Sequence, residues 1–273
     1  ISENKDNLFI FYKRRWIRTL PLYIIILLIV SALTSELLSV DFFKYFFFIQ
    51  KIIPNFLDND YFPVAWSLSI EELFYLFFPI FIVFFNKKNI ITNTIIILFV
   101  IIILKYFLTN NFDSNFYRTG TFLRFDAILL GFLIRHFYNK LIKLKFSLLI
   151  GFLVIFILYY QGQNYIISQQ EQNFIKYIFI LMLQLLSVML MLIFTFLEPF
   201  IAKHNFVKNF SLLISRQTYS IYLMHIIFIY LLNKIEFSLL IANVIYLPSL
   251  FIVSLLIFNY IEKPLLSLRP KMK

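Results

Sequence analysis

Long apolar runs separated by short polar loops constrain the fold of this chain more than any other feature. A helix that crosses the hydrocarbon core of a bilayer needs about 20 mostly apolar residues. Eight runs approach or reach that length, at residues 20–38, 68–85, 90–108, 123–138, 146–160, 174–197, 211–232 and 239–260. The sequence therefore predicts an all-α integral membrane protein, a polytopic bundle of about eight transmembrane helices. A ninth apolar stretch, 42–49, is too short to span and is expected to be interfacial or re-entrant.

The composition supports this class and argues against others. The chain is 61% apolar and 14% charged, with a mean hydropathy of +0.85, whereas soluble domains are roughly 45–50% apolar and about 25% charged. The net charge of +11 raises the question of a nucleic-acid partner. However, the basic residues lie in short loops between apolar runs, as membrane topology requires. We therefore expect membrane lipid, and no nucleic acid, around this protein.

The basic residues also predict an orientation. When loops are assigned alternately to the two sides, with the N-terminus in the cytoplasm, most of the 25 Lys and Arg residues fall inside, as the positive-inside rule requires. This indicates a multi-pass protein of the cell (cytoplasmic) membrane with both termini of the fragment cytoplasmic.

The chain shows no linker and no convincing internal repeat, so residues 1–273 read as a single membrane-embedded domain. It opens with Ile1 in a polar stretch, with no secretory signal peptide, which predicts a fragment of a longer protein. There is no Cys, and the three His residues, 136, 204 and 225, are far apart in sequence. We predict no metal site.

Two adjacent carboxylates, Glu71 and Glu72, stand at the start of the second apolar run. Ser69 and Glu72 match a capping box, which gives Glu72 a structural role. Glu71 has no such explanation, and it shares a helix face with Ser67 and Tyr75. It is either a functional carboxylate or an interfacial one in ordinary water. The predicted topology places it near the extracytoplasmic face.

A basic cluster that includes Arg14, Arg15 and Arg18 precedes the first run. It either sets the topology from the cytoplasmic side or binds a ligand. Arg15 and Arg18 share a helix face at i, i+3, and two guanidinium forks there would clamp phosphate groups.

Arg124 and Asp126 open the fourth run from the outer side. Their spacing points them to different parts of the helix surface, so we expect each to pair with another helix, with Glu71 as a candidate partner for Arg124. The alternative for Arg124 is a snorkelling side chain.

Polar groups also mark the seventh run, where Tyr222 and His225 lie at i, i+3. This helix is expected to face the bundle interior, and the two side chains are either functional or form structural hydrogen bonds across helices. Glu262, Lys263 and Pro264, past the last run, resemble ordinary helix-end residues.

Taken together, these segments resemble the acyltransferase-3 family of membrane-bound O-acyltransferases, related to O-antigen and exopolysaccharide acetylases. The resemblance covers nearly the whole chain and rests on five motifs in order: the Arg-x-x-Arg segment 12–23 ending in Thr-Leu-Pro-Leu-Tyr, Trp-Ser-Leu-Ser-Ile-Glu-Glu-Leu-Phe-Tyr at 66–75, Arg-x-Asp at 124–126 with Gly131, Tyr-Ser-Ile-Tyr-Leu-Met-His at 219–225 and Tyr-Ile-Glu-Lys-Pro at 260–264.

The resemblance implies a ten-helix core, of which about two N-terminal helices are missing here. It implies transfer of an acyl group, usually acetyl, from cytosolic acyl-CoA to a hydroxyl of an extracytoplasmic cell-surface glycan or lipid-linked sugar, with acyl-CoA as donor substrate and no bound cofactor. The family's catalytic His is expected upstream of Ile1, so the fragment alone should be inactive. Arg15 and Arg18 match the family's acyl-CoA pair, and Glu71 is expected to support catalysis.

Two other functions remain open on the sequence. A transporter or flippase for a lipid-linked glycan would also place charges within the membrane, although the few Gly residues and the lack of a repeat argue mildly against it. A non-catalytic membrane scaffold would leave the polar helix faces without a purpose.

Overall fold

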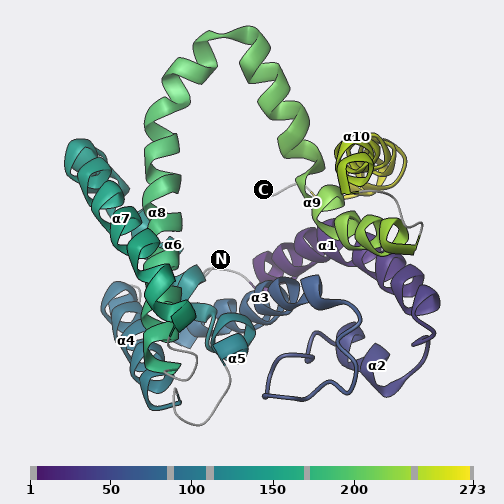
Figure 1. Ribbon diagram of the computed structural model, residues 1–273, viewed down its shortest axis with the longest axis horizontal. Helices are drawn as coiled ribbons and strands as arrows, with labels where there is room; N and C mark the ends of the chain where they lie inside the picture. Colours follow the sequence, from purple (N-terminus) through teal and green to yellow (C-terminus); the bar gives the residue numbers. More distant parts are fainter. Residues whose placement is uncertain (1–4, 85–88, 109–113, 169–172, 235–238, 271–273) are drawn as a thin grey trace. The chain divides into compact units, whose positions relative to one another are not determined.

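A computed structural model describes residues 5–84, 89–108, 114–168, 173–234 and 239–270 (Figure 1). Every regular element within these ranges is helical, which confirms the all-α prediction. The elements are α1 (Lys5–Leu33), α2 (Val40–Phe46), η1 (Pro63–Ala65), α3 (Trp66–Phe84), α4 (Ile90–Leu108), α5 (Ser114–Thr119), α6 (Phe125–Leu141), η3 (Ile142–Leu144), α7 (Lys145–Ser168), α8 (Asn173–Lys203), α9 (Asn205–Lys234), α10 (Leu239–Ile257), η4 (Phe258–Glu262) and α11 (Lys263–Ser267).

Among the residues that the structure describes, six helical stretches are long and apolar enough to cross a membrane: Leu8–Leu33, Ile90–Leu108, Phe125–Gly162, Tyr177–Lys203, Asn205–Leu232 and Val244–Ser267. The protein is therefore a polytopic helical membrane protein, as predicted. The number of eight spans is approximate. One stretch, Phe125–Gly162, is 38 residues long and covers two of the predicted spans. The predicted span 68–85 lies in α3, which is not among the six stretches, and its last residue, 85, lies outside the described residues.

The first helix differs from its predicted bounds, 20–38, at both ends. It begins at Lys5, so the basic cluster is helical, and it ends at Leu33. Beyond that point the backbone turns, with positive φ angles of 62° at Ser35 and 61° at Leu38. The apolar residues 37 and 38 extend the hydrophobic run in the sequence, but these left-handed conformations end the helix before them.

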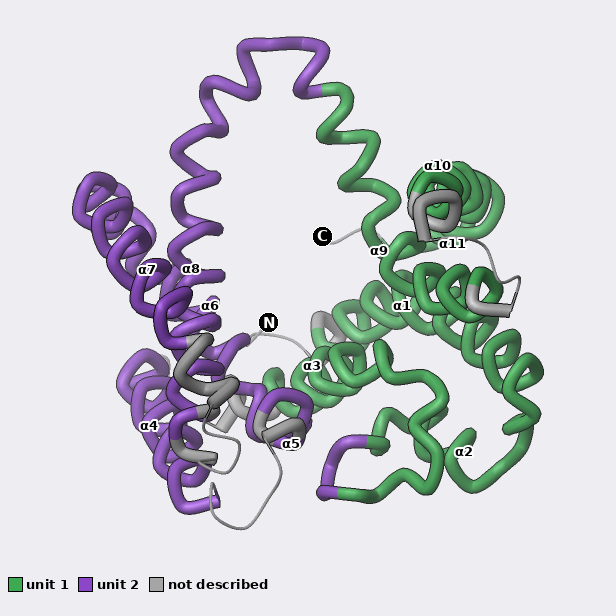
Figure 2. The backbone as a smooth tube through the Cα atoms, viewed as in Figure 1, with its two compact units in different colours: residues 1–50, 55–83, 209–273 green, residues 51–54, 84–208 purple. Residues whose placement is uncertain are grey.

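The chain forms two compact units, which we describe separately (Figure 2). Unit 1 consists of residues 1–50, 55–83 and 209–273, and unit 2 of residues 51–54 and 84–208. In unit 2, α7 packs against α8 and α4 against α6. The prediction of a single domain over residues 1–273 stays a prediction.

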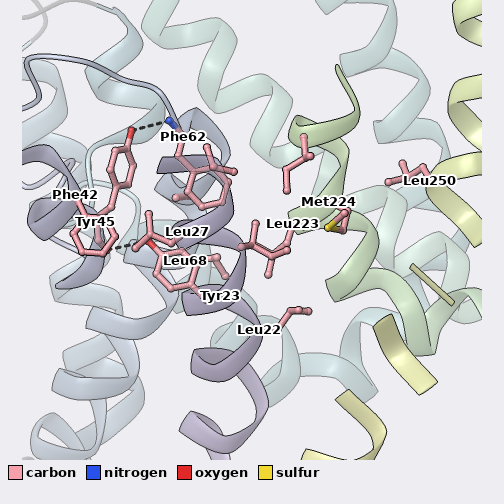
Figure 3. Packing of buried hydrophobic residues seen from close by; sticks show 14 residues of the cluster. Leu22, Tyr23, Leu27, Phe42, Tyr45, Phe62, Leu68, Leu223, Met224 and Leu250 are labelled. Carbon is pink, nitrogen blue, oxygen red and sulfur yellow. Dashed lines mark hydrogen bonds between the residues drawn. The ribbon is translucent and has the colours of Figure 1, made fainter. Parts of the chain in front are cut away.

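The core of unit 1 joins α1, α2, α3, α9 and α10 (Figure 3). Tyr23, in the second half of α1, stacks on Phe48 with ring centroids 4.7 Å apart, and its hydroxyl donates to the carbonyl of Tyr45 at 2.9 Å. Phe62 stacks on the same ring. The segment 34–65 thus folds back along α1 and returns the chain to the middle of that helix before α3 begins.

Asp41 holds this returning segment together. Its carboxylate is buried and accepts hydrogen bonds from Lys44 Nζ at 2.8 Å and from the backbone N–H groups of Asp58 and Asn59 at 3.0 and 2.6 Å. Burial alone would raise the pKa of Asp41, but the hydrogen bonds from Lys44, Asn59 and Asp58 hold it below its ordinary value. The ionised carboxylate is therefore the form that stabilises the segment.

Replacing Asp41 with Asn should accelerate amide hydrogen exchange in residues 39–62 at pH 7. Hydrogen bonds to charged groups contribute about 1.5–3 kcal/mol, so we expect exchange about ten- to a hundredfold faster. Because the folded-state pKa lies below the unfolded one, this stabilisation is complete above pH ~4 and lost as the pH falls through the folded-state pKa. Exchange detected by mass spectrometry measures the effect.

Asp58 provides the matched control for this experiment. Its side chain is 88% exposed and its carboxylate lies 3.5 Å from Lys44 Nζ. The variant Asp58→Asn should exchange like the wild type, since exposed ion pairs contribute little. Equal exchange in the Asp41→Asn variant and the wild type would show that Asp41 does not hold the segment.

Candidate active site

A cavity of about 730 Å³ opens within unit 1, in the size range of ligand sites. Its walls come from α1, the start of α3, the middle of α9, η4 and α11 together with the residues that follow. The lining residues are Arg15, Arg18, Thr19, Ser67, Leu68, Glu71, Ser215, Arg216, Thr218, Tyr219, Tyr222, Phe258, Asn259, Glu262, Lys263, Leu266 and Arg269. The cavity therefore brings together residues from four of the five sequence motifs.

Arg15 and Arg18 both line the cavity, as their shared helix face predicts, but they have different surroundings. Arg15 Nη2 lies 2.5 Å from Glu71 Oε2, and its guanidinium sits 4.0 Å from the centroid of the Tyr75 ring. Arg18 is exposed and makes no hydrogen bond or ion pair in the part of the chain that the structure describes. The guanidinium group of Arg15 is therefore held by the Glu71 carboxylate, whereas the guanidinium group of Arg18 is available to a ligand.

Glu72 supports Arg15 from behind the cavity wall. Its side chain is buried, its Oε1 accepts a hydrogen bond from Thr19 Oγ1 at 2.8 Å, and Arg15 Nε lies 3.6 Å from the same oxygen. The predicted capping box is wrong. The turn η1 starts the helix at Trp66, so Ser69 lies inside the first turn and donates to the Trp66 carbonyl at 2.8 Å.

The contact between Arg15 and Glu71 also corrects the predicted depth of Glu71. The sequence placed Arg15 at the inner face and Glu71 towards the outer face, and both cannot hold for groups 2.5 Å apart. The reason is the segment 34–65, which returns along α1 before α3 starts. Arg15 precedes the end of α1 at Leu33 by 18 residues (33 minus 15), about 27 Å of helix. On the predicted orientation, Glu71 belongs with Arg15 in the inner half.

The helix α9 presents its polar face to the interior, as predicted. The polar residues Gln217 and Ser220, three positions apart, are essentially inaccessible to solvent. Tyr219 donates to the carbonyl of Thr19 at 2.7 Å. Polar bonds therefore fix α9 against α1.

Tyr222 connects α9 to the start of α3. Its hydroxyl donates to the Val64 carbonyl at 2.6 Å, so Ser67, whose Oγ lies 2.7 Å from the same oxygen, is the donor in their contact. His225 Nδ1 lies 2.5 Å from the Tyr222 carbonyl, which cannot donate, so Nδ1 carries the hydrogen. Tyr222 thus lines the cavity, and His225 is not among the lining residues.

Sequence reasoning missed Glu262, which it treated as a helix-end residue. The five residues Phe258–Glu262 form a π-helical turn, and Glu262 is buried and accepts a hydrogen bond from Ser220 Oγ. The only signal in the sequence was the motif Tyr-Ile-Glu-Lys-Pro itself. Single π turns occur often at functional sites, but no sequence pattern of this chain predicted one here.

Sequence reasoning also missed Arg269 as a site residue, and Arg14 holds it in place through hydrogen bonds. Arg269 Nε donates to the Arg14 carbonyl at 3.0 Å, while Arg14 Nη1 donates to the Pro270 carbonyl at 2.5 Å. These two bonds tie the residues after α11 to α1 and place Arg269 on the cavity wall. Arg14, one of the predicted ligand-binding residues, is not itself a lining residue.

The cavity carries an excess of positive charge. Five of its lining residues are cationic, Arg15, Arg18, Arg216, Lys263 and Arg269, against the two carboxylates Glu71 and Glu262. Burial and the neighbouring cations Arg18, Arg14 and Arg15 lower the pKa of Arg269. Cations that repel one another favour an anionic ligand, and guanidinium forks suit phosphate. Within the described ranges, no cluster of three His, Cys, Asp or Glu residues could hold a metal ion.

The predicted residues Arg124 and Asp126 belong to unit 2. Asp126 forms an ion pair with Lys105 of α4, and both side chains are buried. Arg124 Nη1 donates to Gln184 Oε1 of α8 at 3.3 Å. Each residue therefore pairs with another helix, as predicted. Because Glu71 lies in unit 1, a pairing of Arg124 with Glu71 stays a prediction.

The fold and the cavity define a class: a multi-pass helical membrane protein with a cavity among its helices that is lined mainly by cations. Within that class, the family model of the acyltransferase-3 family, described as an acyltransferase domain, matches residues 2–261 of the 273. The chain belongs to this family and is a membrane acyltransferase. No curated protein and no solved structure matches the chain in the corresponding comparisons.

Proposed function

We propose that this protein transfers an acyl group, most simply acetyl, from cytosolic acyl-CoA to a hydroxyl of an extracytoplasmic carbohydrate. The acceptor is an exopolysaccharide, an O-antigen or a similar cell-surface glycan, free or lipid-linked. The enzyme resides in the cytoplasmic membrane with residues 1 and 273 on the cytoplasmic side. The observation that carries this proposal is the cavity with its five cations, since CoA is an acyl carrier rich in phosphate.

The chemistry is an acyl transfer between a thioester and an alcohol. The acceptor oxygen attacks the thioester carbonyl, a C–O bond forms, the C–S bond breaks, and CoA leaves as the thiolate. A general base takes the hydroxyl proton, which finally reaches the CoA sulfur. The His that the resemblance expects upstream of Ile1 is the proposed base, and none of the three His residues of this chain takes that role.

Glu71 supports this reaction in the proposal. Its side chain is 46% exposed and lies on the cavity wall, while Arg15 fixes one of its carboxylate oxygens. The other oxygen is free to accept a hydrogen bond from the acceptor hydroxyl or from a pantetheine amide. Holding a reacting group in place is a large source of rate enhancement.

Membranes from cells that express the full gene should transfer labelled acetyl from acetyl-CoA to a glycan acceptor. The variant Arg18→Ala should raise the KM for acetyl-CoA about ten- to a hundredfold, because a charged hydrogen bond contributes about 1.5–3 kcal/mol. Lys143→Ala, an exposed cation of η3 in unit 2, is the control and should match the wild type. Initial rates at varied acetyl-CoA give these constants.

Two negative results together would refute acyl transfer from acyl-CoA. If no acyl-CoA supports transfer and acetyl-CoA fails to raise the unfolding temperature of the purified protein, the proposal is wrong. Vesicles that move a lipid-linked glycan without acyl-CoA would then favour the flippase.

A further inference from the structure

Four cations of the cavity form no ion pair within the described ranges, and they fall into two pairs. Arg18 and Arg269 form one, on α1 and just beyond α11. Arg216 and Lys263 form the other, on α9 and at the start of α11. A different hydrogen bond positions each pair: Arg269 to the Arg14 carbonyl for the first, and Ser220 to Glu262 for the second.

The Arg18–Arg269 pair depends on the bonds between the end of the described chain and α1. Arg269 Nε donates to the Arg14 carbonyl, so the two Nη atoms of Arg269 point their donors elsewhere. Among the charged groups that lower the pKa of Arg269, Arg18 has the largest effect. Arg14, whose carbonyl holds Arg269, lies one helical turn before Arg18 on α1. Arg18 and Arg269 both line the cavity, so one anion there can meet both guanidinium groups.

The Arg216–Lys263 pair depends on the hydrogen bond between Ser220 and Glu262. Arg216 lies one helical turn before Ser220, on the same face of α9, and Lys263 directly follows Glu262. Joining Ser220 to Glu262 thus brings Arg216 and Lys263 to one side of the cavity. Both side chains are exposed and line the cavity, so they are accessible to a ligand.

The charge of the cavity exceeds what a single phosphodiester requires. The five lining cations outnumber the two lining carboxylates by three. Arg14 and Glu72, which are not lining residues, add one positive and one negative charge and leave this excess unchanged. A phosphodiester, as in phosphopantetheine on a carrier protein, carries one negative charge. A CoA thioester carries a pyrophosphate and a separate 3′-phosphate monoester, which alone carries about −1.5 to −2.

We propose that the cavity reads two separate phosphate sites of its donor: the Arg18–Arg269 pair binds the pyrophosphate and the Arg216–Lys263 pair binds the 3′-phosphate of the ribose. The inference rests on the proposed function and deepens it. The donor is then a free CoA thioester, and neither a 3′-dephospho-CoA thioester nor an acylated carrier protein replaces it.

Binding of CoA and 3′-dephospho-CoA to the purified full-length protein tests this inference. In nanodiscs of phosphatidylcholine, the wild type should bind dephospho-CoA about ten- to a hundredfold more weakly than CoA. The variants Arg216→Gln and Lys263→Gln should weaken CoA binding and leave dephospho-CoA binding unchanged. Arg18→Gln should weaken both ligands, and Lys143→Gln neither.

The possible failures are distinguishable. If the wild type binds CoA and dephospho-CoA equally, or if Arg216→Gln weakens both alike, the 3′-phosphate site is refuted while the proposed function stands. If neither ligand binds, both proposals fail. The basic pairs could alternatively hold a lipid phosphate. In that case phosphatidylglycerol in the nanodiscs would abolish the difference between the two CoA ligands, which overturns the inference.

Discussion

Arg15→Ala should lower the turnover of acyl transfer by about 30-fold or more, with little change in the KM for acetyl-CoA. A hydrogen bond to a charged group contributes about 1.5–3 kcal/mol, and each 1.36 kcal/mol is tenfold in rate. The side chain of Arg15 is 14% exposed and serves both Glu71 and the buried Glu72. Its loss leaves Glu71 without the contact that orients it.

Measuring KM and kcat separately distinguishes a role of Arg15 in orienting Glu71 from the phosphate-binding role that the sequence suggested. If Arg15 bound donor phosphate, Arg15→Ala would act like Arg18→Ala and raise the KM with kcat unchanged. Adding Glu71→Gln to Arg15→Ala should cost little more, since interacting residues are not additive. Arg15→Lys, which keeps the charge but loses the fork, should fall between the wild type and Arg15→Ala.

Lys105→Met should destabilise unit 2 by about 3–5 kcal/mol, because it leaves the buried carboxylate of Asp126 without its cation. Both side chains of this pair are buried, at 0% and 3% exposure. The measurement is thermal or denaturant unfolding of the purified protein in detergent. The double variant Lys105→Met with Asp126→Leu should recover most of the loss, since an apolar pair of similar volume replaces a buried ion pair without large cost.

Lys143→Met is the matched control for the stability experiment, because it removes an exposed cation from the same unit. It should leave the unfolding midpoint unchanged. If Lys105→Met unfolds like this control, the ion pair with Asp126 does not stabilise unit 2.

The sequence predicted the helical class and most spans, because lipid demands long apolar runs and the bilayer sets their length. Helix α4 begins and ends at the predicted residues, 90 and 108. Lys105, however, lies in the last turn of α4, paired with the buried Asp126. Hydropathy does not distinguish a charge that faces water from one that faces a partner.

The site was predictable only in part, for a similar reason. The positions Glu71, Arg15 and Arg18 were identified from their charge, and the face shared by Arg15 and Arg18 from helix period. The depth of Glu71 was not, because it depends on how segment 34–65 folds, which rests on tertiary contacts such as that of Tyr23 with the Tyr45 carbonyl. Arg269 was missed because its place is set by Arg14, 255 residues away in the chain.

Because of the π turn η4, the geometry of the cavity depends on how many residues lie between α10 and α11, as well as on which residues they are. An α-helix advances about 100° per residue, and a π turn accommodates about one residue more than an α turn. The helix after Phe258–Glu262 is therefore out of phase with α10 before it. Lys263 lines the cavity in this shifted phase, so the number of residues in the turn helps to decide which cation faces the cavity.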